Sequence, residues 1–476
     1  MVLVNKRSAV KTLATMAKQD KAKKKRQLPK KVPSKTSSSA RSRRNIPAVV
    51  RVLRTCPEDE SLVLVDPRSV GVNPKYLAEY EDAMRRASRR GIIPGCASVV
   101  LRHGELVQAN SFGFADLELR RPFRLDTICR VYCMTKTYVT VLFMTLVEQG
   151  LARLKDPVSQ YIPAFANVEV TGGAKPKRLM RLGHLLKHTS GLSYGASYNG
   201  KPKSEAESSY AKLMNAVDRG HVRDLEDFTN RLARIPLQAH PGDQYMYGYS
   251  TDVLGRVCEV IMGMSLDACL RQRLFDPLGM HDTGFAVPDE KLHKLAALYS
   301  KQATWDILYG KVSGAQPCIS HNGMVRVDGN RPEDSAWRKG QESKVISGGG
   351  FLGKNEGGLL STVADTSRFV RMLVRRGVGW NGHRVLREET LAMMEEQQLD
   401  PALAKEERQC LFGALGGFSG EEFGWGGAAC TYWSLDRKSG NAIVWFTQHL
   451  DMPEWEDQDV VDASKADIWT VLHRGV

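Results

Sequence analysis

Apolar residues recur first at helical and then at strand-like spacing near the start of the patterned part of the chain. Between residues 72 and 91 they follow the 3.6-residue period that predicts an amphipathic helix. The apolar stripe of this helix consists of Tyr76, Leu77, Tyr80, Met84 and Ala87. Two short runs of strand-forming residues follow, 97–102 and 106–112, separated by His103 and Gly104. This arrangement predicts an antiparallel hairpin with a tight turn.

The residues after the hairpin predict a long buried helix and then a mainly helical middle section. Residues 133–149 are largely apolar, and Gly150 stands where helices commonly end. From about 151 to 410 the pattern is helical or loop-like, with glycine-rich joints. We therefore expect a helical insertion over this stretch.

Strand character returns toward the C-terminus. Two strand-like runs, 423–435 and 442–448, enclose a turn at 436–441, and a last helix is expected over 460–473. Strands at both ends of a helical middle indicate an α+β fold with one antiparallel sheet flanked by helices. No internal repeat is present. We assign residues 57–476 to this domain.

The net charge of +15 is concentrated in the first residues of the chain. Of 68 lysines and arginines, 17 lie within residues 1–54 beside a single acid, Asp20, and the remainder has 51 basic and 52 acidic residues. Residues 1–56 are therefore predicted to form a basic, disordered extension. Near-helical apolar spacing among its first twenty residues favours an import sequence, whereas the Lys-Arg block at 21–26 favours nuclear localisation. A polyanion-binding arm and a solvated extension without a specific partner are the other interpretations.

Several classes of protein are excluded by composition. The 42% hydrophobic content is that of a globular protein, and no apolar run reaches the roughly 18–20 residues needed to cross a bilayer. The N-terminus lacks the apolar core of a secretory signal, so an intracellular location is expected, with nucleus, mitochondrion and cytosol left open. The nine cysteines form no C-x-x-C pair and no zinc-type cluster, which favours reduced thiols.

Candidate chemistry appears where the long apolar helix is predicted to begin, at Cys133-Met134-Thr135-Lys136. Residues three apart at a helix start lie on one face, so the thiol and the ammonium can meet. The positive potential of a helix N-terminus and the lysine both favour a thiolate at Cys133. The alternative for this short pattern, taken alone, is an inert buried cysteine beside a surface lysine.

The surroundings of this pattern resemble a known family. The chain is similar to class C β-lactamases, family VIII carboxylesterases and related penicillin-binding-protein-like enzymes, which carry S-x-x-K where this chain has Cys133 and Lys136. The resemblance covers roughly residues 70–470 and implies the β-lactamase/transpeptidase-like fold. It rests on six segments in the family's order, at 128–136, 181–192, 241–255, 275–283, 347–365 and 423–428.

The resemblance also implies roles for single residues. Cys133 takes the position of the acyl-accepting nucleophile, and Lys136 that of the adjacent base or electrostatic activator. Tyr247 matches the tyrosine that shuttles a proton to the leaving group. Tyr249 falls where β-lactamases have an asparagine and is included in the substrate site. No metal or organic cofactor is implied.

The last segment supplies the oxyanion and substrate edge of the implied site. The backbone N–H groups of Cys133 and Ala428 would form the oxyanion hole. Trp425, Gly426 and Gly427 would line the edge strand, where glycines let a substrate approach the backbone closely. Trp425 stands where β-lactamases carry a cation that holds a substrate carboxylate. This change favours small neutral esters, lactones, thioesters or amides as substrates.

Cysteine in place of serine leaves more than one hypothesis for function. A thiol beside a lysine can ionise and attack a carbonyl, which predicts a working thiol hydrolase or acyltransferase. Sulfur is larger than oxygen, however, and a misplacement on the order of 1 Å can cost about a hundredfold in rate. A catalytically inactive protein that keeps the fold for binding or assembly is therefore the alternative. A redox-sensitive thiol at Cys133 is a third hypothesis.

Two other patterns mimic functional motifs. Gly191-Leu192-Ser193-Tyr194-Gly195 spells the nucleophile elbow of α/β-hydrolases, but the residues before Ser193 are predicted to be helical rather than a strand. His184 and His188 stand four residues apart and are expected on one helix face. The zincin glutamate is absent between them, which favours structural histidines over a metal pair.

Overall fold

The fold is described from a computed structural model that covers most of the patterned region. The described residues are 60–195, 204–301, 323–329, 339, 345–350, 358–396, 403, 417–419 and 422–450. The extension predicted at 1–56 and the helix predicted at 460–473 lie outside these ranges.

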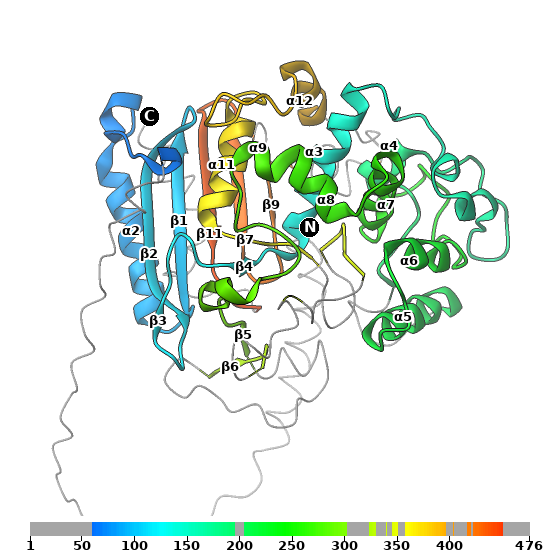
Figure 1. Cartoon of the computed structure of the whole chain (residues 1–476), viewed down its shortest axis with the longest axis horizontal. Helices are drawn as coiled ribbons and strands as arrows, with labels where there is room; N and C mark the ends of the chain where they lie inside the picture. Colours follow the sequence, from blue (N-terminus) through cyan, green and yellow to red (C-terminus); the bar gives the residue numbers. More distant parts are fainter. Residues whose placement is uncertain are drawn as a thin grey trace, which may run out of the picture. The chain divides into compact units, whose positions relative to one another are not determined.

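An antiparallel sheet organises the described part of the chain (Figure 1). Its strand order is β3-β2-β1-β11-β10-β9-β8. The strands are β1 (Gly95–Arg102), β2 (Glu105–Asp116), β3 (Arg121–Pro122), β8 (Gly417–Ser419), β9 (Glu422–Gly426), β10 (Tyr432–Asp436) and β11 (Asn441–Phe446). Strands from the two ends of the domain thus lie side by side, with Ala97 opposite Phe446 and Arg102 opposite Asn441. The predicted α+β fold with one antiparallel sheet flanked by helices is confirmed.

The first hairpin forms where the sequence predicts it. The turn between β1 and β2 is made by His103 and Gly104, with φ angles of 54° and 84°. A two-residue turn with both φ values positive matches the natural twist of antiparallel strands. Both strands are longer than the predicted runs and pair from Arg102 and Glu105 back to Gly95 and Gly113.

The strand expected at 423–435 is two strands. β9 ends at Gly426, and β10 begins at Tyr432 after a turn in which Gly427 donates to the carbonyl of Thr431 at 2.8 Å. The turn is closed by Cys430, whose φ is 60°. The run of glycine and alanine before it offers no large side chains for cross-strand packing, so the strand is free to turn there.

Helices cover both faces of the sheet because β1 alternates its side chains between two cores. Helix α2 (Pro74–Arg89) is capped by the side chain of Asn73 and packs with Cys96 and Val100. On the other face, α11 (Val363–Val374) packs with the alternate residues of β1, including Val99. This period of two is the expected signature of a sheet buried on both sides.

The remaining elements are mostly helices and short turns, and most of them lie in the middle section that the sequence predicts to be helical. The α-helices are α3 (Thr135–Glu148), α4 (Leu182–Leu186), α5 (Glu205–Asp218), α6 (Leu225–Leu232), α7 (Ser250–Met262), α8 (Leu266–Leu270), α9 (Asp276–Leu278) and α12 (Glu388–Glu395). The 3₁₀ and π turns are η1 (Glu60–Leu62), η2 (Pro67–Val70), η3 (Tyr132–Met134), η4 (Val158–Gln160), η5 (Pro163–Asn167), η7 (Arg271–Phe275) and η8 (Asp289–Lys294). Two small ladders pair β4 (Cys129–Arg130) with β7 (Leu360–Ser361) and β5 (Tyr299–Lys301) with β6 (Met324–Arg326).

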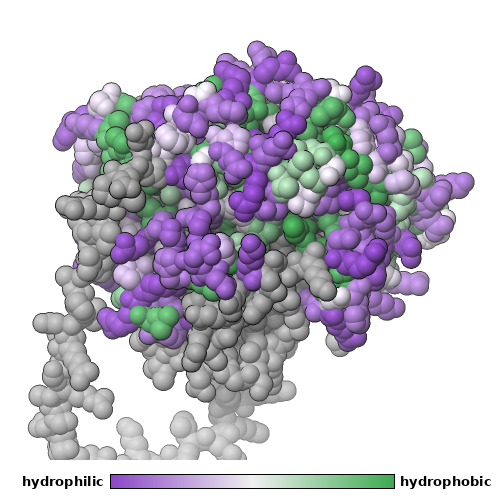
Figure 2. Space-filling model, in the orientation of Figure 1, coloured by the Kyte–Doolittle hydropathy of each residue, from purple (hydrophilic) through white to green (hydrophobic). Residues whose placement is uncertain are grey.

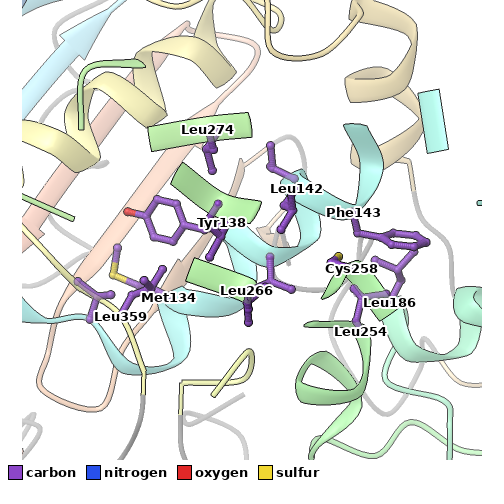
Figure 3. Packing of buried hydrophobic residues seen from close by; sticks show 14 of the residues in the cluster. Met134, Tyr138, Leu142, Phe143, Leu186, Leu254, Cys258, Leu266, Leu274 and Leu359 are labelled. Atoms are coloured by element: carbon purple, nitrogen blue, oxygen red, sulfur yellow. The ribbon is translucent and has the colours of Figure 1, made fainter. Parts of the chain in front are cut away.

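Helix α3 is the buried centre of the helical region. Every residue from Thr135 to Leu146 is buried. Figure 3 shows Tyr138, Leu142 and Phe143 of α3 among apolar side chains of the neighbouring elements. The α-helix starts at Thr135, because Tyr132–Met134 form the 3₁₀ turn η3 instead. Cys133 therefore lies just before the α-helix and not within it.

Most of the described surface in view is polar, with apolar residues in small separate patches (Figure 2). The exposed large apolar side chains are scattered and include Val63, Leu119 and Leu179. Among the helices that the structure describes, none combines the length and the hydrophobicity needed to span a bilayer.

Truncating Leu142 should destabilise the domain strongly. Its side chain is fully buried in α3, so Leu142→Ala leaves a cavity and should lower the free energy of unfolding by about 2–5 kcal/mol. Urea unfolding monitored by circular dichroism measures the change. The control Leu151→Ala removes a leucine that is 49% exposed and should cost about 0.5 kcal/mol or less. Equal losses in the two variants would contradict the central place of α3.

Candidate active site

Cys133 lies in a tight turn whose backbone is held on several sides. Tyr132 before it has a φ of 45°, which is uncommon for a bulky residue. Val131 donates to the carbonyl of Leu359 at 3.1 Å, and the Tyr132 carbonyl lies so close to Gly350 that any side chain at 350 would collide with it. Unusual backbone that the surroundings enforce is typical of functional sites. The turn leaves the Cys133 side chain 8% exposed.

Lys136 is fully buried in the first turn of α3, near the Cys133 thiol. Its Nζ donates to Tyr194 Oη at 3.0 Å and also to the carbonyl of Gly349. Burial lowers the pKa of the Lys136 ammonium, while the charges of Cys133 and Asp252 oppose that change. The structure thus brings together the two residues of the C-x-x-K pattern, and Lys136 is not a surface lysine.

Two tyrosines border the Lys136 ammonium. Its Nζ lies 4.6 Å from the centroid of the Tyr247 ring and 5.6 Å from that of Tyr194. The two tyrosine rings meet edge to face at 5.5 Å, and Tyr247 also contacts the ring of Trp425 at 6.0 Å. A cation over aromatic faces is stabilised by the ring quadrupoles. Tyr247 therefore lies beside the Lys136 side chain, and Trp425 packs behind it against the Tyr247 ring.

Sequence reasoning missed Tyr194, whose hydroxyl accepts a hydrogen bond from Lys136. The residue follows directly on Ser193, within the segment that mimics a nucleophile elbow. A signal was present, because Tyr194 follows only two residues after the 181–192 segment that resembles the family. Ser193 itself has a structural contact, since its Oγ accepts from the backbone of Gly195 at 2.9 Å. The element before Ser193 is the helix α4 and not the strand that an elbow needs.

Tyr249 lies in the core beside the site. It is fully buried, and its ring packs against Tyr194 at 4.6 Å, Phe228 at 5.5 Å and Tyr210 at 5.9 Å. A ring enclosed on these sides presents no surface to a substrate. This burial corrects the expectation that Tyr249 contributes to the substrate site.

The glycine-rich end of β9 lies against the turn that carries Cys133. A side chain at Gly427 would collide with the carbonyl of Val131, and Ala428 packs in the same small cluster as Tyr132. Within the described residues, β8 pairs with Glu422 and Phe423 but not with the rest of β9. Among the residues that the structure describes, the edge of β9 opposite β10 therefore has no strand partner from Gly424 to Gly426. Trp425, Gly426 and Gly427 are each part-exposed.

The two histidines of the 181–192 segment do not share a helix face. Helix α4 ends at Leu186, and His188 adopts a φ of 52° beyond it, so the expected face is wrong. His184 Nδ1 accepts from the backbone of Arg181 at 3.1 Å, which helps to cap α4. Among the described residues, no group of three or more His, Cys, Asp or Glu side chains is arranged to hold a metal.

His188 is buried against the aromatic part of the site. It is fully buried, its ring lies 5.0 Å from that of Tyr247, and neither ring nitrogen has a hydrogen-bond partner in the described structure. Burial, helped by the charge of Lys136, lowers the pKa of His188 to about 3. The imidazole is therefore neutral at ordinary pH.

Comparisons with known sequences point to one family. A family model described as Beta-lactamase matches residues 80–467. Protein Rv1367c of Mycobacterium tuberculosis is 28% identical over 405 residues, which cover 77% of this chain and 88% of that protein. Esterase EstB of Burkholderia gladioli is 29% identical over 396 residues, covering 80% of this chain and 93% of the esterase.

Solved structures show the same fold. EstCE1, a hydrolase with promiscuous acyltransferase activity, aligns with a TM-score of 0.62 at 22% identity and covers 85% of this chain and 98% of its own. Simvastatin synthase LovD from Aspergillus terreus aligns with a TM-score of 0.61 at 21% identity, covering 82% and 96%. At these identities the likeness concerns the fold.

His188 should make the stability of the domain depend on pH. Its pKa falls from an ordinary value near 6.5 to about 3, so the unfolded chain binds the proton more readily than the folded one. The contribution of neutral His188 is complete above pH 6.5 and is lost as the pH falls toward 3. Replacing His188 by Leu should therefore reduce the loss of stability between pH 7 and pH 4.5. Urea unfolding at both pH values measures this difference.

The exposed histidine His383 provides the matched control. His383→Leu should leave the loss of stability between the two pH values as it is in the unmodified protein. If His188→Leu loses as much stability on acidification as His383→Leu does, the interpretation of His188 is wrong.

Proposed function

The chain belongs to the β-lactamase family of hydrolase-type enzymes, and from this premise we propose that it forms an acyl-enzyme at Cys133. We propose small neutral esters, lactones or amides as its substrates. The observation that carries the proposal is the burial of Lys136 close enough to the Cys133 thiol for the two groups to interact electrostatically. Acyl transfer needs a nucleophile with a proton acceptor within hydrogen-bond reach, and this pair supplies both.

The proposed reaction has two halves. In the first, Lys136 acts as a neutral amine, so one proton has left the site beforehand, and it takes the thiol proton as Cys133 Sγ bonds to the carbonyl carbon of the substrate. Collapse of the tetrahedral intermediate breaks the bond to the leaving group, which takes up a proton through Tyr247. In the second, water adds to the thioester, releases the acid and restores the proton to Cys133. An alcohol in place of water would give acyl transfer.

The developing oxyanion needs donors that are already in place. We assign this role to the backbone N–H groups of Cys133 and Ala428. The proposal is supported by the packing of Ala428 in one cluster with Tyr132, the residue before the nucleophile. Because the carbon–sulfur bond is longer than a carbon–oxygen bond, the attacked carbonyl must sit slightly differently from that of a serine ester.

The side chains beside the pair favour a substrate without negative charge. The ring of Tyr247 lies 4.6 Å from Lys136 Nζ, and the ring of Trp425 packs against Tyr247. Lys136 is already occupied by Tyr194 and by the carbonyl of Gly349. A substrate carboxylate would find no cation at position 425 and would lose its hydration against aromatic surface.

A non-catalytic binding or assembly protein is the competing function. The observation that favours it is the replacement of the nucleophile itself by cysteine. In that case the site would bind its ligand without forming a covalent bond, and the basic extension would serve as the targeting or docking element.

An activated ester should acylate Cys133. We expect intact mass spectrometry with p-nitrophenyl acetate to show a single acetyl adduct and release of p-nitrophenol beyond one equivalent. Cys133→Ala should abolish the adduct, and Lys136→Ala should slow its formation about a hundredfold or more, which is typical of the loss of a general base. Peptide mapping locates the adduct.

Ser193→Ala is the matched control, because Ser193 is the other nucleophile suggested by the sequence, and it should keep the adduct. Absence of a Cys133-dependent adduct, with hydrolysis gained only in Cys133→Ser, would reject catalysis and support the binding function.

A cation at position 425 should widen the range of substrates. Trp425→Lys is expected to raise kcat/KM for an ester that carries a carboxylate, such as mono-p-nitrophenyl succinate, relative to p-nitrophenyl acetate. An exposed ion pair is worth up to about 1 kcal/mol, so a shift of about fivefold in the ratio is expected. The unmodified protein should prefer the neutral ester, and the reverse preference would contradict the proposed substrate class.

A further inference from the structure

Asp252 is a buried carboxylate close to the Cys133–Lys136 pair. It lies in the first turn of α7 and is fully buried. Its Oδ1 accepts from Ser347 Oγ at 2.7 Å and from the backbone N–H of Gly349 at 3.0 Å. Its Oδ2 has no hydrogen-bond partner in the described structure. A buried carboxylate satisfied on one oxygen alone requires compensation from a nearby positive charge.

Gly349 connects Asp252 to Lys136. Its N–H donates to the carboxylate, and its carbonyl accepts from the lysine Nζ. A side chain at this position would collide with Asp252 Oδ2 and would press on Tyr194 Oη. Because Gly349 has no Cβ, Asp252 can bind its N–H while Lys136 binds its carbonyl, so a single residue bridges the carboxylate and the ammonium.

The groups that face Lys136 come from several elements. Cys133 lies in η3, and His188 and Tyr194 follow α4. Tyr247 comes just before α7, and Asp252 lies in the first turn of that helix. His188 is neutral, as its burial requires. Among the described residues, Asp252 is the carboxylate that acts electrostatically on Lys136.

We propose that Asp252 is a positioning residue which serves as the resting counter-ion of Lys136 and thereby opposes loss of the proton from Cys133. The proposal rests on Cys133 and Lys136 being the pair used in the proposed function. A carboxylate, an ammonium and a neutral thiol sum to zero charge in this buried site. Ionising the thiol as well would add a negative charge without a partner, which low-polarity surroundings disfavour.

The titration of Asp252 agrees with this assignment. Burial raises the pKa of its carboxyl to about 6, while the hydrogen bond from Ser347 and the charge of Lys136 lower it. The carboxyl is therefore ionised at neutral pH and above, where the thiol is used.

The test removes the charge and keeps the shape. Asn at position 252 retains an oxygen that can accept from Ser347 and Gly349, so Asp252→Asn deletes the counter-ion with little change in geometry. Alkylation of Cys133 by iodoacetamide, followed by peptide mass spectrometry, gives its rate against pH. The midpoint of the first rise should move to lower pH by about one unit or more, as expected for loss of a nearby like charge.

Two variants serve as matched controls. Ser347→Ala removes a hydrogen bond to the carboxylate but leaves its charge. Asp365→Asn deletes another buried carboxylate, which lies in α11 and bonds to Thr283 and Arg368. Both should keep the midpoint of the unmodified protein.

An unchanged midpoint in Asp252→Asn would overturn the proposal. So would a uniform rise in rate at every pH, because that result reports loosened packing. The alkylation requires no turnover, so failure of the ester assay would count against the proposed function alone.

A second measurement keeps the test decisive if Asp252→Asn does not fold. Lys136→Met should leave Asp252 as an unpaired buried charge, and adding Asp252→Asn to that variant should raise its Tm. Thermal unfolding at pH 8 compares the two proteins. An equal or lower Tm in Lys136→Met/Asp252→Asn would show that the two side chains are not partners.

Discussion

The burial of one ammonium group in the first turn of α3 is the constraint on which the rest of the site depends. A lysine without solvent must find its polar partners within the protein. Here it donates to the hydroxyl of Tyr194 and the carbonyl of Gly349, and it interacts electrostatically with the thiol of Cys133 and the carboxylate of Asp252. These groups come from segments that are far apart in the sequence. The same requirement therefore shapes the packing of the helical region and the chemistry of the site.

Cysteine in place of serine changes the charge balance around a buried lysine. A serine hydroxyl ionises only when a base removes its proton, whereas a thiol ionises within reach of neutral pH. A site that holds a permanent cation beside a thiol would favour the ion pair at rest. In the proposed arrangement Asp252 balances the ammonium, so Cys133 stays a thiol at rest and one proton must leave the site before Lys136 can act as a base. The carboxylate thus matters more for this chain than it would for a serine enzyme.

Sequence patterns were informative where the local physics is decisive. The hairpin at His103-Gly104 and the apolar stripe of α2 follow from turn chemistry and helical period, and spaced motifs led to Cys133 and Lys136. Contacts between distant segments are a different matter. The burial of Tyr249 and the hydrogen bond from Lys136 to Tyr194 depend on how α3, α4 and α7 pack together. Sequence motifs bring both tyrosines near the site, but they do not show that one is buried in the core and the other accepts a hydrogen bond from Lys136. The turn after β9 was missed because alternation alone does not show where a strand ends.

The pairing of β1 with β11 has a consequence for the biosynthesis of this protein. Ala97 meets Phe446, so the centre of the sheet closes only after about 350 further residues have been made. The turn that carries Cys133 rests against Gly427, which also belongs to the late-made part of the chain. A nascent chain on the ribosome can form the first hairpin and α3 early, but the segment around Gly427 that packs against the turn carrying Cys133 has not yet been made. The site is therefore completed only once β11 has been made, as a property of the whole domain.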